Sequence, residues 1–358
     1  MVHRSAAPLV LLSVAVVAGE GLPKTDRIPA APTAQQEVLI AEGIALYDAG
    51  QHDSAVAKYK QVLEESPDQV HALYELAFTY LTKKDLESAL ALAHRGVQYR
   101  SELLPRFCIL LGNALDDLGK RAEAIEVYRD GIKQAPMTAL LHFNLGLALM
   151  RSGKHPEAKK ALQQSVSLDP NHASSHYLLA SVYLQLGYPV PAILALSRLL
   201  LIEPVSPKGK EALAILYELV RGSATRGERP NEIRITPART PDSRKDEGDF
   251  DVVALALSMG IGAALIEDLP QASEFKRVAI ICGVMAEPMS AMKKKGFAAK
   301  YYAPFFAEMA KRGFVKAFIY RAFQAAQLAG SAEWGKENDG KLREFEAWFR
   351  GYRWPSAK

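Results

Sequence analysis

The sequence predicts an all-α protein: five stacked helix pairs, a capping helix and then a small helical C-terminal domain. Three recurrences predict the helix pairs. A small residue returns every 34 or 35 residues, an alanine follows it after twelve residues, and a proline usually follows after twelve more. The small residues are Gly43, Ala77, Gly112, Gly146, Ala180 and Ala214; the alanines are Ala55, Ala89, Ala124, Ala158 and Ala192; the prolines are Pro67, Pro136, Pro170 and Pro204, with Ser101 in the second repeat.

Each recurrence has a physical role in a pair of antiparallel helices. A small residue on the first helix lets the second helix approach closely, and bulky residues fill the space around that contact. Glycine in a turn such as Asp48-Ala49-Gly50-Gln51 ends the first helix. Proline ends the second helix because it lacks the N–H that the helix would use. One pair cannot bury its apolar face alone, so the pairs are expected to stack into a solenoid.

This pattern resembles the tetratricopeptide-repeat (TPR) family over residues 36–222. The resemblance implies a right-handed α-solenoid with repeats at 36–69, 70–104, 105–138, 139–172 and 173–206, closed by a capping helix at 207–222. One departure is that no repeat has tryptophan near the start of its first helix.

The resemblance also implies a concave surface lined by the first helix of each repeat. The residues at the lining positions are Tyr74, Phe78, Arg106, Asn113, Phe143, Asn144, Leu147, Tyr177 and Ser181. The asparagine amides are expected to pair with the backbone of an extended peptide, and the aromatic rings to receive its side chains. The alternative is that some of these residues pack between neighbouring repeats. The lysine and asparagine set that grips a C-terminal carboxylate in some TPR proteins is not expected here, because the corresponding positions are largely apolar or acidic.

The N-terminus predicts export. Residues 1–18 are interpreted as a signal peptide, with an apolar run from Ala6 to Ala18 and small residues that favour cleavage before Gly19. The run is shorter than the roughly 20 apolar residues of a spanning helix, so an uncleaved anchor is the less favoured alternative. A proline-rich linker follows at 19–35, and the mature protein is expected in the periplasm or outside the cell.

Residues 223–248 lose the repeat and are interpreted as a disordered, basic linker. Residues 249–358 are expected to form a second all-helical domain. Its predicted helices are 252–267, 271–286, 297–311 with a kink or restart at Pro304, 315–328 and 336–350. Aromatic residues are dense in this domain, and a packed core is favoured over an aromatic surface that binds a partner or covers the groove.

Charge, cysteine content and missing motifs argue against several classes of function. The net charge of +4 is small and concentrated in the linker, so no nucleic-acid partner is expected. Cys108 and Cys282 are interpreted as packing thiols, and a disulfide between them stays open. No recognised catalytic, cofactor or metal motif is present, and residues 249–358 hold no histidine, so no catalytic residue, cofactor or metal site is predicted.

Together these features predict an exported, non-catalytic scaffold that binds a protein or peptide in its concave groove. Two alternatives stay open: a cell-envelope enzyme with its site in 249–358 and the repeats recruiting substrate, and a structural spacer that pairs with a second copy of the chain. Fold alone does not decide among them.

Overall fold

A computed structural model describes residues 27–221, 224–226, 228, 232–235, 246–266 and 274–356. The chain divides into two compact units at residues 148 and 149, within helix α7 (Ala139–Arg151). We call residues 27–148 the N-terminal unit and residues 149–356 the C-terminal unit.

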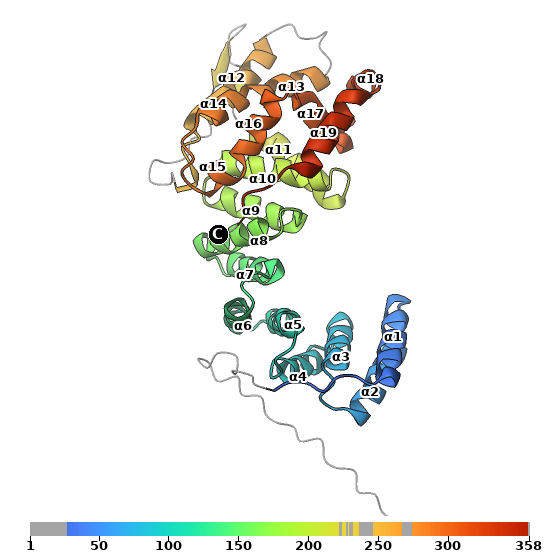
Figure 1. Cartoon of the computed structure of the whole chain (residues 1–358). Helices are drawn as coiled ribbons and strands as arrows, with labels where there is room; N and C mark the ends of the chain where they lie inside the picture. The colour runs from blue at the N-terminus through green and yellow to red at the C-terminus, as the bar shows by residue number, and fades with distance from the viewer. Residues whose placement is uncertain are drawn as a thin grey trace, which may run out of the picture. The chain divides into compact units, whose positions relative to one another are not determined.

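The N-terminal unit consists of consecutive antiparallel helix pairs (Figure 1). Its helices before α7 are α1 (Ala34–Asp48), α2 (His52–Glu65), α3 (Val70–Thr82), α4 (Leu86–Gly96), α5 (Leu104–Asp117) and α6 (Arg121–Gln134). Each pair packs closely, and each pair contacts the next through α2 and α3 or α4 and α5. These helices match the predicted repeats, so the helix-pair architecture predicted from the sequence is confirmed.

In the first and third repeats, the small residue of the first helix is a glycine that contacts a tyrosine of the second helix. A methyl group added at Gly43 would come within 2.4 Å of Cε1 of Tyr59, and one added at Gly112 within 2.3 Å of Cε1 of Tyr128. Both tyrosines are almost fully buried. Glycine at these positions therefore sets the distance between the two helices of a pair, as the sequence pattern predicts.

The turn after each first helix contains one residue in the left-handed region. Gly50, Lys84 and Gly119 take this position in the N-terminal unit, with φ between 64° and 79°. Glycine adopts this backbone without steric strain, whereas lysine does not. Lys84 is therefore the one strained member of the series in this unit's described residues.

The segment before α1, predicted as part of a linker, is tied to the second repeat. The backbone N–H of Arg100 donates to the carbonyl of Arg27 at 2.8 Å, and Arg27 pairs with Tyr99 in an isolated parallel bridge. Residues 1–26 lie outside the described part of the chain, so the signal peptide and its cleavage site stay predictions.

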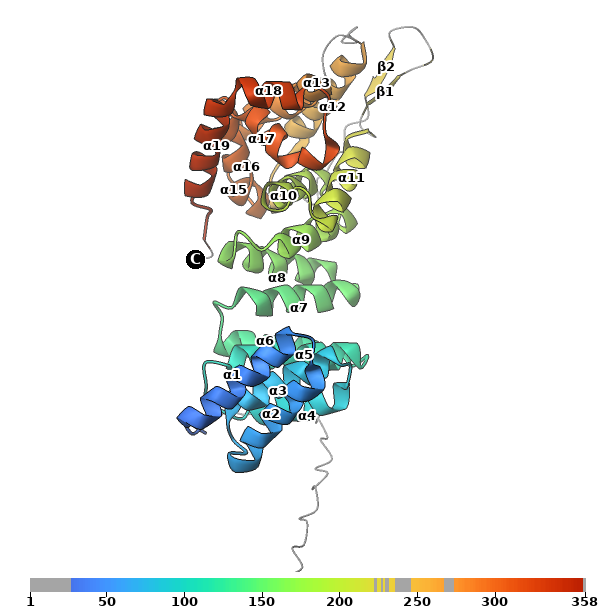
Figure 2. The ribbon, with the colours of Figure 1, turned by 90° about the vertical axis from the view of Figure 1, so that its right-hand side faces the viewer.

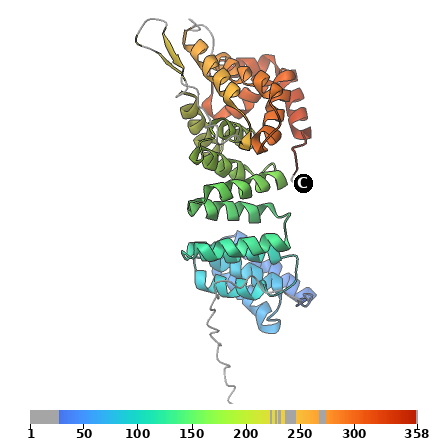
Figure 3. The same ribbon diagram turned by 90° about the vertical axis from the view of Figure 1, so that its left-hand side faces the viewer.

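The C-terminal unit joins the last repeat to the helices that follow it (Figures 2 and 3). The repeat helices are α8 (His155–Leu168), α9 (Ala173–Gln185), α10 (Pro189–Ile202) and the capping helix α11 (Pro207–Arg221). The helices after them, here called the C-terminal helices, are α12 (Asp251–Ile266), α13 (Glu274–Val284), α14 (Ala286–Ala291), α15 (Phe297–Tyr301), α16 (Ala303–Lys311), α17 (Val315–Ala322), the short 3-10 helix η3 (Gln324–Ala326), α18 (Ser331–Glu337) and α19 (Asp339–Gly351).

The C-terminal helices are more numerous than the five predicted from the sequence. The restart predicted at Pro304 is confirmed, since α15 ends at Tyr301 and α16 begins at Ala303. Helix α14 is not predicted, the predicted helix 336–350 corresponds to α19, and α18 lies almost entirely before the predicted range. Within the segment interpreted as a disordered linker, β1 (Ala224–Arg226) and β2 (Ile233–Ile235) form an antiparallel pair, with Thr225 opposite Arg234.

The C-terminal helices pack on the second helices of the last two repeats. Residues Val190–Leu201 of α10 are buried without exception, which an amphipathic surface helix would not show. The Tyr301 hydroxyl donates to the Val166 carbonyl of α8 at 2.6 Å, and Arg321 Nε donates to the Leu201 carbonyl of α10 at 2.9 Å. These contacts join the C-terminal helices and the last repeat into one core.

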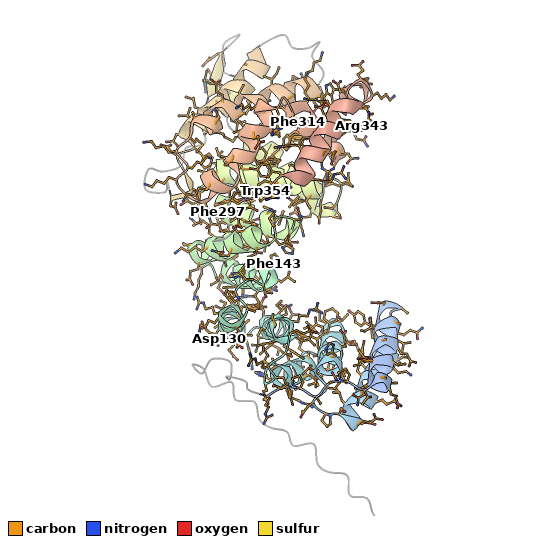
Figure 4. The ribbon with its side chains drawn as sticks, viewed as in Figure 1. Asp130, Phe143, Phe297, Phe314, Arg343 and Trp354 are labelled. Atoms are coloured by element: carbon orange, nitrogen blue, oxygen red, sulfur yellow. The ribbon has the colours of Figure 1, made fainter. Side chains whose placement is uncertain are left out.

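That core holds most of the aromatic residues of the C-terminal helices, which confirms the core interpretation. Tyr301, Tyr302, Phe305, Phe306, Phe314, Phe318 and Phe323 are buried. Tyr320, by contrast, is 37% exposed. Figure 4 places Trp354 at the end of the chain beside the repeat helices, where its ring stacks on Phe305 at 4.8 Å between centroids.

Candidate peptide-binding groove

The first helices of the N-terminal unit form one surface. Helix α3 contacts both α1 and α5, whereas contacts between successive second helices are fewer. First helices that lie closer together than second helices make the inner face of a curved stack, which is the surface that the sequence predicts to be concave.

Four aromatic rings make a continuous strip across this surface. The Tyr47 and Phe78 ring centroids lie 5.4 Å apart, the Phe78 and Tyr74 centroids 6.1 Å apart, and the Tyr74 and Phe107 centroids 5.6 Å apart. The strip therefore runs from α1 across α3 to α5. Tyr47 is further held by a hydrogen bond of 2.9 Å between its hydroxyl and Thr82 Oγ1.

Phe107 is fully buried and anchors the strip, whereas Phe78 is 37% exposed. Ile44, one turn before Tyr47 on α1, is 38% exposed. Apolar side chains that a fold leaves partly exposed side by side provide contact area for a partner. The sequence analysis missed Tyr47 and Ile44, although the same lining positions of the first repeat would have indicated them.

Charged groups lie beside the strip. The guanidinium carbon of Arg106 lies 5.9 Å from the Tyr74 ring centroid. Burial raises the pKa of the Glu75 carboxyl; Arg106 opposes this rise and Asp48 adds to it. The structure thus brings the predicted residues Tyr74, Phe78 and Arg106 together.

The two asparagines do not present free amides as predicted. Asn113 Oδ1 accepts a hydrogen bond of 2.7 Å from the Tyr128 hydroxyl, and Asn144 Nδ2 donates to the Leu140 carbonyl of its own helix at 2.9 Å. Each amide therefore has one side engaged within the protein. The alternative that some lining residues pack between helices applies to Asn113.

Phe143 and Leu147, on α7, are half-buried (Figure 4 labels Phe143). Tyr177 and Ser181 belong to the C-terminal unit. The Tyr177 hydroxyl donates to Glu211 Oε1 at 2.5 Å, and Ser181 Oγ donates to the Tyr177 carbonyl at 3.1 Å. Both lie on the first helix α9, whereas the C-terminal helices contact mainly α10 and the capping helix α11.

A buried polar cluster holds the C-terminal helices on the repeats. The Glu247 carboxylate, 2% exposed, accepts hydrogen bonds from Gln163 Nε2 at 2.8 Å and from the Tyr183 hydroxyl at 2.9 Å. Lys159 Nζ donates to Asp246 at 2.5 Å and lies 2.8 Å from Glu247. Burial disfavours the charge on Lys159, but these two carboxylates outweigh it and raise the lysine pKa. The end of the segment interpreted as a disordered linker is therefore fixed.

The C-terminal helices also form an open cleft of about 630 Å³ between α14 and α16. Glu287, Glu308, Lys294 and Lys311 are among its lining residues. Glu308 Oε1 accepts hydrogen bonds from Arg312 at 2.8 Å and from Trp348 Nε1 at 3.3 Å. This carboxylate is thus held as an acceptor within the fold.

Both cysteines are free thiols. Burial raises the pKa of Cys108 and of Cys282 to about 12, as expected for packing residues. In the described residues, no group of three histidine, cysteine or carboxylate side chains could hold a metal ion. Across the same residues, no helix is both long and apolar enough to cross a membrane.

Comparison with solved structures finds helical-repeat proteins. A crystal structure of MamA is 22% identical, covers 47% of this chain and 91% of its own, and has a TM-score of 0.40. The TPR protein TTC0263 from Thermus thermophilus is 23% identical, covers 52% of this chain and 99% of its own, with a TM-score of 0.42. YrrB, described as a TPR protein with an unusual peptide-binding site, is 20% identical, covers 49% of this chain and 89% of its own, with a TM-score of 0.39.

A search of curated proteins finds no match. Family models do match the chain: one tetratricopeptide-repeat model matches residues 46–102, a second matches 139–172, and a TPR-repeat model matches 112–153. These matches coincide with the helix pairs, the close glycine–tyrosine contacts and the left-handed turns described above. Residues 46–102 and 112–172 of the chain are tetratricopeptide repeats.

Proposed function

We propose that the protein is an exported, non-catalytic scaffold that binds a protein or peptide on the first-helix surface of its repeats. The observation that carries this proposal is the aromatic strip, in which the Phe78 ring lies between those of Tyr47 and Tyr74 and stays partly exposed. Ile44, one turn before Tyr47 on α1, is partly exposed as well. Aromatic side chains held rigidly at a surface are common anchors of binding energy.

The cleft between α14 and α16 is the feature that an enzyme would use. Its carboxylate Glu308 is bonded to Arg312 and Trp348, which favours a structural role. A carboxylate that acts as a general base must lie within reach of a substrate proton, whereas this one already accepts two hydrogen bonds within the fold. The aromatic strip is therefore the better supported functional surface.

The proposal is tested by affinity capture from the envelope fraction of the source organism. The bait is the protein without residues 1–18, beside a variant with Tyr47, Tyr74 and Phe78 changed to alanine. We expect a specific protein to be retained by the parent and lost from the variant, because truncating an anchor residue commonly weakens binding by about 2 kcal/mol or more.

A matched control changes the exposed residue Met137 to alanine, which removes apolar area away from the strip. Its capture should equal that of the parent. Equal capture by the strip variant, with its helical circular dichroism intact, would show that binding lies elsewhere. If the parent does retain a specific protein, that purified protein must also form a complex with the purified parent when no other component is present.

The export part is tested separately by N-terminal sequencing of the mature protein from the periplasmic fraction. A mature chain that begins at Gly19 supports it. A chain that keeps residues 1–18, or that stays in the cytoplasm, overturns it.

A further inference from the structure

Asp48 and Glu75, which follow Tyr47 and Tyr74 of the aromatic strip in sequence, lack an ion-pair partner among the described residues. Asp48 ends α1, and Glu75 lies on α3 beside Tyr74. The N-terminal unit pairs some of its carboxylates with a lysine or arginine within 4 Å, such as Glu42 with Lys58 and Asp117 with Lys84, and leaves exposed ones such as Glu37 without such a pair among its described residues. Glu75 differs from these exposed carboxylates because its side chain is half-buried. Within the part of this unit that the structure describes, no such pair is found for Asp48 or Glu75.

Glu75 is only partly exposed to water. Burial and the negative charge of Asp48 both disfavour its ionised form, as the raised pKa of its carboxyl shows. A carboxylate in such a place loses hydration without gaining a partner, which costs free energy. An added positive charge would recover part of that loss.

The nearest arginine does not supply this charge by direct contact. Arg106 lies over the Tyr74 ring, 5.9 Å from its centroid, and makes no ion pair with Glu75 within 4 Å in the described residues. Arg106 does lower the pKa of Glu75, but by less than burial raises it. The Glu75 carboxylate therefore keeps an electrostatic penalty that a second cation would relieve.

The aromatic rings around the carboxylates favour a cation as well. Tyr47, Tyr74 and Phe78 lie on the two helices that carry Asp48 and Glu75. A lysine or arginine over an aromatic face gains about 0.5–2 kcal/mol, and its aliphatic stem packs on apolar side chains such as Ile44.

We propose that this end of the surface binds a lysine or arginine side chain of an extended partner peptide, between the aromatic strip and the carboxylates of Asp48 and Glu75. The inference rests on the proposed function and adds to it the chemistry of the partner. The peptide's charged head pairs with Glu75 and Asp48, and its stem lies on Phe78 and Tyr47.

A positional-scanning peptide library tests this inference. The purified protein without residues 1–18 is applied to immobilised peptides in which each position is varied in turn among all residues. We expect one position to select lysine or arginine over glutamine by at least about fivefold, the size of about 1 kcal/mol.

Glu75→Gln keeps the size of the side chain and removes its charge, so it should abolish this selection. Asp48→Asn should weaken the selection. Glu126→Gln is the matched control, because it removes a carboxylate from the second helix α6, and it should keep the full preference.

The outcomes separate the two proposals. Peptides bound with no preference for a basic residue, or a preference that survives in a folded Glu75→Gln variant, overturn this inference and leave the scaffold function standing. No peptide bound above background by the parent contradicts both.

Discussion

At the level of single residues, two equivalent tyrosines differ in one hydrogen bond. Tyr59 and Tyr128 pack against Gly43 and Gly112 in the same way. The Tyr128 hydroxyl donates to Asn113, which follows its glycine. Ile44 follows Gly43 instead, so the buried Tyr59 hydroxyl has no partner in the described part of the chain.

The same substitution should therefore have opposite effects at the two sites. Tyr128→Phe removes a hydrogen bond and should lower the free energy of unfolding by about 1 kcal/mol. Tyr59→Phe removes a buried hydroxyl without a partner and should leave the free energy unchanged or raise it. Urea unfolding followed by circular dichroism measures both. A larger loss at Tyr59 than at Tyr128 would contradict this account.

The fourth and fifth repeats each have a histidine at the same position of the first helix, and each histidine contacts the carbonyl of the proline six residues before it. His142 Nε2 lies 2.9 Å from the Pro136 carbonyl, and His176 Nε2 lies 3.0 Å from the Pro170 carbonyl. His176 is fully buried, and its Nδ1 lies 2.8 Å from the Tyr302 hydroxyl. Since a carbonyl only accepts, Nε2 of His176 carries the proton, and Nδ1 accepts from the tyrosine.

This environment predicts a pH dependence of stability. Burial, helped by the charge of Arg198, lowers the pKa of His176 to about 3. Because the unfolded chain binds the proton near pH 6.5, the His176 contribution is complete above that pH and is lost as the pH falls toward 3. By about pH 5 the loss from this residue should be about 2 kcal/mol.

Nuclear magnetic resonance of the histidine side chains checks this directly. The His176 ring signals should stay those of the neutral Nε2–H form from about pH 8 down to about pH 5. Titration of His176 near its ordinary pKa would show that the contact with Tyr302 is absent in solution.

Part of the candidate binding surface could be predicted from single residues of the sequence. Tyr74, Phe78 and Arg106 follow from their positions in the repeat, and Tyr47 follows from the same rule. The engagement of Asn113 does not, because it depends on a tyrosine that occupies one repeat and not the next.

At the level of helices, the repeat pattern predicts pairing, since each glycine, alanine and proline acts within its own pair. The packing of the C-terminal helices on α8 and α10 is not predictable in this way. It depends on contacts between residues far apart in sequence, such as Lys159 with Asp246 and Tyr301 with Val166. In the sequence, the only sign of the uniform burial of α10 is that this second helix is unusually apolar.

The segment after α19 holds this packing together. The Trp354 ring lies 5.2 Å from Tyr301 and 4.8 Å from Phe305 between centroids, and 4.5 Å from the Arg198 guanidinium carbon. Arg198 is 1% exposed, and its Nε and Nη1 have no hydrogen-bond partner among the residues that the structure describes. Its Nη2 donates to the Pro170 carbonyl and to Asn171 Oδ1, and the aromatic faces of Trp354 and Phe349 add to the compensation of this buried charge.

Trp354→Ala should destabilise the C-terminal unit by about 2–3 kcal/mol, less than for a fully buried tryptophan. Trp354→Phe keeps an aromatic face over Arg198 and should lose less than half of that. Urea unfolding of both variants measures the difference. An unchanged midpoint for the alanine variant would show that the end of the chain does not dock.

At the level of the whole molecule, the all-α solenoid and its helical C-terminal part follow from the sequence. The repeat period, family matches and helix pairs agree on it. A partner is not encoded in the same way, because a repeat fixes the surface that it presents and leaves its ligand open. Export, the oligomeric state and a pairing with a second copy stay predictions.

The most direct test of the central claim is site-specific crosslinking in the source organism. A photoreactive phenylalanine derivative replaces Phe78 in one strain and Met137 in another. The account predicts that position 78 crosslinks to a discrete protein partner and that position 137 does not. Equal crosslinking at both positions, or none at position 78 in a stably produced protein, would contradict the claim that the first-helix surface is the binding site.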